Sequence, residues 1–521
     1  MIMNLYYEYF TKNKRILSFF MVMSLYLLSY LFFSVIFEDG DDIAMQQIIQ
    51  GAITGKPDVH LVFINVIVGY ILKPFYEFNN QIYWYSFMMV LFQFIALSII
   101  LHCLLLNKIK WYGILIILFF SLYFIVRLQF TSVSGLLAIA GMLMLNNSIS
   151  TNSGWFYFVS FLLLSFSMLL RFEMFLLTFT ICSFFLLFEH LSKLMAVISG
   201  KIFLFFSVFF LIFLLFSVWI NFESYNRDRE WKYFYEYNSV RGRFNDNPNS
   251  ANLKEEFKKK SLKRYELDLA RNFVFPNTYD LKKISILLEQ MRPDVNQKII
   301  NVYFAIRKIP IFLGLLFLSL IAFLSIRKKF YFQVFPIGLV FLFFVYISFE
   351  HYLKPRVLYP IILAIVIFTI LRKNTVSLKK ISIGLLLLGI FNVYNFTTIA
   401  YTNKSLEIPR NKFIILLSPF PFSVHPFKLN DQNNYSNLIR RGWLTNSPLY
   451  INALREKGLK VNQHLSWIDN EILNENVLYH IKMGSSMYNN ITEYLFLKNK
   501  KLVPTKLNSN LYKIENNIIN Q

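Results

Sequence analysis

The sequence predicts a mainly α-helical protein that crosses a membrane many times, and three observations indicate this class. Of the 521 residues, 56% are hydrophobic and only 16% are charged, and the mean hydropathy is +0.46. Apolar runs long enough to span a bilayer recur along the chain. Basic residues stand beside alternate runs, as they do in oriented membrane proteins. Because a soluble core cannot hide this much apolar surface, we expect an integral membrane protein.

We expect about eleven membrane-spanning helices, because each span needs roughly 17–25 mostly apolar residues. The candidate runs are 16–37, 82–106, 113–126, 130–145, 155–170, 172–188, 202–220, 309–326, 330–349, 357–371 and 381–400. A further apolar run, 61–78, is interrupted by Asn65, Lys73 and Pro74. It is therefore expected to lie at the membrane surface rather than to cross. Residues 1–400 thus form a predicted transmembrane domain.

The loop charges predict the orientation of the chain. Lys12, Lys14 and Arg15 precede the first run, and the alternate loops 108–110, 193–201, 327–329 and 372–380 are basic as well, whereas the loop 146–154 is neutral. These loops are expected to be cytoplasmic, and an odd number of spans then places the C-terminus outside. The outer side would carry a first loop at 38–81, a large loop at 221–308 and the tail 401–521. This tail mixes strand-like and helix-like stretches, which predicts a small extracytoplasmic α/β domain.

The net charge of +23 would indicate a nucleic-acid partner in a soluble chain. Here the basic residues flank apolar runs, so membrane lipids are the expected partner and nucleic acid is not. Cys103 and Cys182 both lie inside apolar runs, so neither a disulfide framework nor a cysteine metal site is predicted.

An acidic cluster follows the first apolar run, in the stretch FEDGDDIAMQQIIQGAITGKPDVH. Its carboxylates are Glu38, Asp39, Asp41 and Asp42. One interpretation is helix capping by Asp41 and Asp42, with Gly55 at the far end. The other is a general base, because a carboxylate that is crowded and partly desolvated gains proton affinity. No cofactor is assigned, a divalent cation at this loop stays an alternative, and His60 is a further candidate contact for a substrate.

Cationic side chains stand at predicted outer helix ends, where Lys and Arg are normally scarce. They are Arg127, Arg171 beside Glu173, and three residues of the turn EHYLKPRVLYP, namely His351, Lys354 and Arg356. Arginine matches the oxygens of a phosphate with a planar fork of donors, and Lys or His adds charge. A lipid-linked phosphate is therefore a candidate ligand. The alternative is that these side chains contact lipid headgroups or pair locally, as Arg171 would with Glu173.

Several stretches resemble the GT-C class of membrane glycosyltransferases. DDIAMQQIIQGAITGKPDVHLVFINVIVGYILKPFY is similar to the first-loop pattern of poorly characterised bacterial members from surface-polysaccharide loci. QFTSVSGLLAIAGML and SMLLRFEMFLL resemble the spans that follow, and KPRVLYP resembles the outer Arg-containing turn. The resemblance implies a GT-C-like fold in the bacterial cytoplasmic membrane and a polyprenyl-phosphate-linked sugar as donor. It also implies that a first-loop Asp, here Asp41 or Asp42, activates the acceptor, while Arg356 and Lys354 hold the donor phosphate.

The expected function is transfer of a sugar to a cell-surface glycan or lipid-linked acceptor on the outer face of the membrane. The nearest alternative is an O-antigen-type repeat-unit polymerase, which would use outer-loop arginines such as Arg241 and Arg243. A third alternative is a transporter or flippase of lipid-linked sugars. Transporters usually place ionisable residues near the bilayer midplane, in related halves. The predicted spans are almost without charge and no repeat is visible, so the sequence favours the enzyme.

Overall fold

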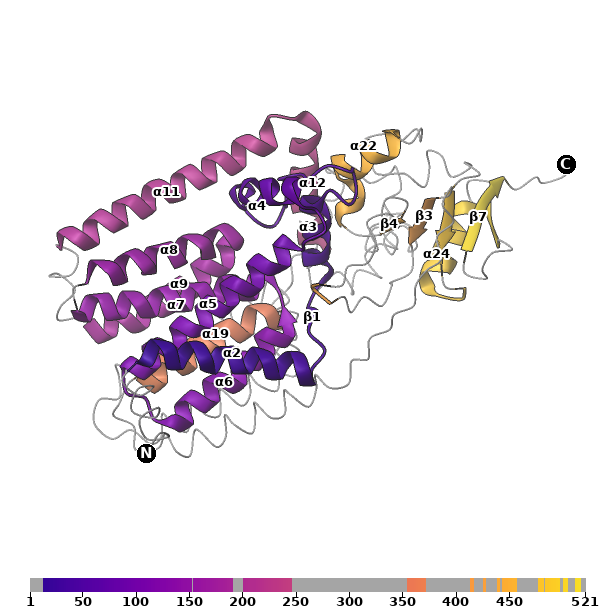
Figure 1. Ribbon diagram of the computed structural model, residues 1–521. Helices are drawn as coiled ribbons and strands as arrows, with labels where there is room; N and C mark the ends of the chain where they lie inside the picture. The colour runs from indigo at the N-terminus through magenta and orange to yellow at the C-terminus, as the bar shows by residue number, and fades with distance from the viewer. Residues whose placement is uncertain are drawn as a thin grey trace, which may run out of the picture.

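The computed structural model describes most of the first half of the chain and shorter parts of the second half. The described residues are 13–151, 153–190, 200–245 and 354–371, followed by 413–416, 425–427, 438–440, 443–456, 477–481, 483–496, 500–504 and 511–516. Helices predominate in this part of the chain (Figure 1). The predicted mainly helical class is therefore confirmed for the described residues.

Apolar helices run side by side and form a bundle (Figure 1). They are α2 (Lys14–Phe32), α5 (Trp84–Leu106), α6 (Trp111–Val126), α7 (Phe130–Thr151), α8 (Gly154–Leu170), α9 (Phe172–His190), α11 (Lys201–Asn226) and α19 (Pro355–Leu371). Among the described helices, α2, α5, α7 and α11 are long and apolar enough to cross a membrane, whereas α6, α8, α9 and α19 are shorter apolar helices. The predicted spans 309–326, 330–349 and 381–400 lie outside the described residues, so the count of eleven stays a prediction.

The first predicted span, 16–37, was wrong at its C-terminal end. The helix α2 ends at Phe32, and Ile36–Phe37 form the short strand β1 instead. This strand pairs in parallel with β2 (Arg127–Leu128), in the register Ile36 to Arg127. Residues 36–37 are apolar because they are buried beside β2, and not because they continue the span. The pairing fixes the end of α2 next to the end of α6.

Helix α7 forms the centre of the bundle, since every residue from Phe130 to Ser148 is buried. Small residues allow its neighbours to approach closely, as is common between membrane helices. A Cβ atom at Gly135 would lie 2.5 Å from the Pro360 side chain of α19. Ser134 and Ser167 of α8 each donate a hydrogen bond to the other's backbone carbonyl, both at 2.8 Å. This close packing positions α19, and with it Arg356, against the start of α7.

Three helices of the two predicted outer loops gather near one end of the bundle (Figure 1). They are α3 (Gly40–Gln50), α4 (Val66–Phe78) and α12 (Arg229–Asn245). The helix predicted for the interrupted run is confirmed over Val66–Phe78, and it exposes Tyr70, Phe75 and Phe78. Its place at a membrane surface stays a prediction. The sequence NLKEEFKKKSLKRYELDLA of the large outer loop predicts a charged helix over residues 252–270, and this stretch lies outside the described residues.

The described parts of the tail contain both strands and helices. A five-stranded sheet has the order β4-β3-β5-β7-β6, in which β4, β3 and β5 are parallel and β7 and β6 are antiparallel. Its strands are β3 (Phe413–Leu416), β4 (Leu438–Arg440), β5 (Val477–His480), β6 (Lys500–Pro504) and β7 (Leu511–Asn516). The helical elements are η3 (Trp443–Asn446), α22 (Pro448–Glu456) and α24 (Ser486–Phe496). Whether they form a separate domain stays a prediction.

Candidate functional site

The acidic cluster lies at the N-terminal end of α3, directly after β1. Asp39 is the N-cap residue and its carboxylate accepts a hydrogen bond from the backbone of Gly40 at 2.6 Å. Asp41 and Asp42 lie in the first turn, where carboxylates are favoured by the helix dipole. The helix ends at Gln50, and its C-cap residue is Gly51, whose φ of 75° is left-handed. The capping interpretation was therefore wrong about the residues. The N-cap is Asp39 and not Asp41 or Asp42, and the C-cap is Gly51 and not Gly55.

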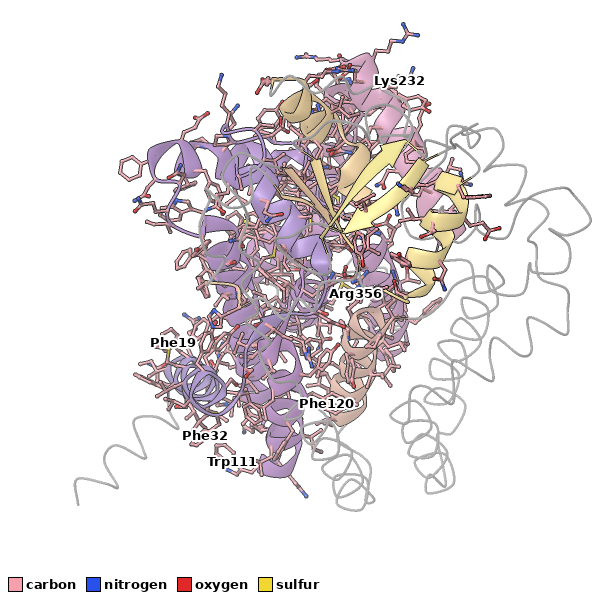
Figure 2. All side chains as sticks on the ribbon, turned by 90° about the vertical axis from the view of Figure 1, so that its right-hand side faces the viewer. Phe19, Phe32, Trp111, Phe120, Lys232 and Arg356 are labelled. Atoms are coloured by element: carbon pink, nitrogen blue, oxygen red, sulfur yellow. The ribbon has the colours of Figure 1, made fainter. Side chains whose placement is uncertain are left out.

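Arg356 joins this cluster from the first turn of α19, more than 300 residues further along the chain. Its Nη1 contacts a carboxylate oxygen of Asp39, and its Nη2 lies 3.5 Å from Oδ2 of Asp41. The backbone carbonyl of Arg356 also accepts a hydrogen bond from Ser132 of α7 at 3.2 Å. Only 11% of the Arg356 side chain is exposed. In Figure 2, Arg356 lies near the middle of the molecule, away from Phe19, Phe32 and Trp111 at its margin.

Asp41 is held by groups from two distant segments. Its Oδ1 accepts a hydrogen bond of 3.0 Å from the indole N–H of Trp443, which begins η3, while its Oδ2 faces Arg356. Burial raises the pKa of Asp41, whereas the charge of Lys354 and the bond from Trp443 act in the opposite direction. The side chain keeps 21% of its surface exposed. Asp41 is thus a partly accessible carboxylate whose charge is supported from several sides.

Asp42 occupies a different environment, although it is the next residue. It is fully buried, and its Oδ1 accepts hydrogen bonds from the hydroxyl of Tyr85 at 2.8 Å and from the backbone N–H of Phe130 at 3.2 Å. Its Oδ2 has no hydrogen-bond partner. Burial raises the pKa of Asp42 well above its usual range, and the nearby charge of Asp41 raises it further. The hydrogen bond from Tyr85 acts in the opposite direction. Burial thus favours the protonated form of Asp42, and its Oδ1 satisfies the backbone N–H of the first residue of α7.

Glu38 is partly buried on the other side of Asp39. Tyr123 of α6 donates a hydrogen bond to its Oε1 at 3.0 Å, and its Oε2 is buried without a partner. Burial raises the pKa of Glu38, while the bond from Tyr123 and the charges of Arg356 and Arg127 lower it. The predicted residues Arg127 and Arg356 therefore both lie within electrostatic reach of one buried carboxyl group.

Of the remaining predicted substrate contacts, Arg171 lies near Asp41, whereas His60 lies away from the acidic cluster. Arg171 acts electrostatically on Asp41, forms an ion pair with Glu173 at 3.0 Å, and lies over the ring of Phe63. His60 lies elsewhere: its Nδ1 contacts Asp58 at 2.8 Å and its ring stacks on Trp231 with centroids 4.3 Å apart. The structure thus gives His60 a role in joining the first outer loop to α12. His351 lies outside the described residues.

Sequence reasoning missed two kinds of site residue. Trp443, Tyr85 and Tyr123 bond directly to the carboxylates. Arg241 of α12, which the sequence connected only with the polymerase alternative, is buried and acts electrostatically on Asp41. The scarcity of Trp in the tail, which holds only Trp443 and Trp467, was the one local signal for Trp443. The two tyrosines were hidden among the many aromatic residues of the spans.

The acidic cluster offers carboxylate oxygens, the donors that hard divalent cations prefer, together with a guanidinium group. Within the described ranges, no three His, Cys, Asp or Glu side chains are grouped as metal ligands. A guanidinium group occupies the space beside Asp39 and Asp41 instead. The carboxylates and arginine can orient a hydroxyl group, accept its proton and stabilise negative charge. A cation at the first loop stays a prediction.

No protein-family model matches the chain, and no curated protein or solved structure is significantly similar to it.

Proposed function

We propose that the protein is a membrane glycosyltransferase of the GT-C type, which transfers a sugar from a polyprenyl-phosphate donor to a glycan or lipid-linked acceptor. The observation that carries the proposal is the contact of Arg356 with Asp39 and Asp41 at one end of the apolar bundle. It joins the two features that resemble the GT-C class, the acidic first loop and the KPR turn. A polar site of this kind beside membrane helices suits a substrate with a lipid tail and a hydrophilic head.

Asp41 is the better of the two candidates for the general base. A base must be ionised and must reach the proton of the acceptor hydroxyl. Asp42 is fully buried and so is out of reach of an acceptor, and burial raises its pKa well above its usual range. Asp41 is partly exposed, and the charges of Lys354, Arg241 and Arg171 favour its ionised form.

In the proposed reaction, the acceptor oxygen attacks the anomeric carbon of the donor sugar. The bond from that carbon to the phosphate oxygen breaks, and polyprenyl phosphate leaves with the electron pair. The proton of the acceptor hydroxyl passes to Asp41. Lys354 and Arg171 would stabilise the departing phosphate, while Arg356 would orient Asp39 and Asp41. Sequestering both substrates in one orientation supplies much of the remaining rate enhancement.

The test compares Asp41→Asn with Asp42→Asn in membranes supplied with a polyprenyl-phosphate sugar. We expect Asp41→Asn to lower kcat by roughly 100- to 10,000-fold, the usual contribution of a general base. Asp42→Asn is expected to keep most of the activity. Asp58→Asn is a matched control, because it makes the same substitution in the same loop beside His60. Full activity of Asp41→Asn would remove the basis of the assignment.

A repeat-unit polymerase is the second candidate, because Arg241 of the large outer loop is buried and acts electrostatically on Asp41. Its guanidinium also bonds to Asn238 at 2.7 Å, which fixes its orientation. The length of the product distinguishes the two activities. A transferase adds one sugar per donor lipid, whereas a polymerase produces a ladder of repeat units from lipid-linked oligosaccharides.

A further inference from the structure

Trp443 of the tail donates a hydrogen bond to Asp41 of the acidic cluster. Its side chain is 7% exposed, so the indole is enclosed rather than available as a surface for stacking a sugar. The ring meets Phe63 edge-on, with centroids 4.7 Å apart. Phe63 in turn lies beneath Arg171. Trp443 is therefore packed into the wall of the site and presents its N–H to Asp41.

The segment that carries Trp443 is attached at a second point. Arg455, in the last turn of α22, donates to the carboxylate of Glu230 in α12 at 3.1 Å. Ser447 precedes α22, is fully buried, and accepts at its hydroxyl from the backbone N–H of Tyr450 at 3.4 Å. In Figure 1, α22 lies beside α12 at the end of the bundle where α3 begins. The position of Trp443 is thus set by a docked helix and not by a loose chain end.

An indole N–H can only donate a hydrogen bond. The bond from Trp443 therefore favours the ionised form of Asp41, to which hydrogen bonds are stronger. It also engages Oδ1 while Arg356 faces Oδ2, so the plane of the carboxylate is fixed from two sides. Without the N–H, the carboxylate would be free to rotate and would lose one group that supports its charge.

We infer that Trp443 is a positioning residue for Asp41, and that residues 443–456 of the tail complete the site in which Asp41 acts. The inference deepens the proposed function and its kinetic part rests on it. Asp41 orients and deprotonates the acceptor only while this segment is docked. The reaction would thus depend on a part of the chain that lies outside the membrane helices.

The test uses Trp443→Phe, which keeps a ring against Phe63 but removes the N–H group. Trp231→Phe is the matched control, because Trp231 is equally buried at 6% exposure but stacks on His60 instead of meeting Asp41. The first measurement needs no substrate: the fluorescence difference between the wild type and Trp443→Phe is recorded across pH. We expect this difference to titrate with Asp41 and to become independent of pH in an Asp41→Asn background. A fluorescence difference that does not vary with pH overturns the inference. So does a pH dependence that stays the same in the Asp41→Asn background.

The second measurement is the pH profile of sugar transfer. The charged and titratable groups around Asp41 include Glu38, Asp39, Asp42, Tyr85, Arg171, Arg241, Lys354 and Arg356. None of these groups is altered in Trp443→Phe. A shift of the acidic limb of the pH profile therefore reports the loss of the hydrogen bond from the indole N–H to Asp41. We expect the limb to move to higher pH and kcat to fall by roughly 10- to 100-fold, with the donor KM within about threefold. A profile that matches Trp231→Phe would overturn the inference. Transfer that is absent from every form, including the wild type, would refute the proposed function, while the fluorescence titration would still decide the role of Trp443.

Discussion

Replacing Asp42 by Asn tests the protonation state that separates the two neighbouring aspartates. Burial raises the pKa of Asp42 well above its value in the unfolded chain. The folded protein therefore holds a proton there over a pH range in which the unfolded chain has already lost it. Stability contributed by this group is fully present below the unfolded pKa and is lost as the pH rises towards the folded pKa. The loss is about 1.4 kcal/mol for each pH unit between the two values.

An amide keeps the geometry of the protonated acid and does not titrate. Its oxygen can accept the bonds from Tyr85 and from Phe130 that Oδ1 of Asp42 now accepts. Its amino group occupies the place of Oδ2, which already has no partner, so little new cost arises. We therefore expect Asp42→Asn to be close to the wild type in stability at low pH and to be more stable at neutral pH.

The assay is thermal unfolding in detergent from pH 4 to pH 8, followed by intrinsic fluorescence. The wild type should lose melting temperature relative to Asp42→Asn as the pH rises, and the difference should grow with pH. Asp58→Asn serves as the control, because Asp58 forms an ion pair with His60 outside the cluster. An Asp42→Asn variant that is destabilised equally at every pH would show that Asp42 is ionised in the fold, and the reasoning would fail.

Two further predictions concern the packing of the first outer loop. Gly69→Ala should lower the free energy of unfolding by about 1–3 kcal/mol, because the added Cβ would lie 2.3 Å from the carbonyl oxygen of Val59. Thermal unfolding measures this loss. The control is Gly154→Ala, which should have little effect because no atom lies within 4 Å of the added Cβ. His60→Phe should keep the stacking on Trp231, lose the polar contacts of the imidazole and lower the melting temperature while leaving sugar transfer within about threefold. A rate that fell tenfold or more at unchanged stability would instead place His60 among the substrate contacts.

Composition and hydropathy alone were enough to locate the apolar helices. Each predicted span that falls within the described residues contains an apolar helix, although the first ends at Phe32 and not at Phe37. A long run of apolar residues has few other ways to satisfy its backbone in a bilayer. Local composition also located the N-terminal end of α3, since short acidic side chains at a helix start satisfy free N–H groups. It did not identify the capping residue. Asp39, Asp41 and Asp42 are chemically equivalent until their surroundings differ.

Only the tertiary structure distinguished these carboxylates and assembled the site. Tyr85 and the start of α7 enclose Asp42 and leave it favouring a proton, whereas Asp41 faces Arg356 and Trp443. The last two residues lie several hundred positions away, in segments whose local patterns carry no sign of the contact. Burial and charge act through space, so the proton affinity of a carboxylate is a property of its folded environment. The sequence could therefore indicate an acidic site and an arginine turn, but the packing of α3, α19 and η3 decided that they meet.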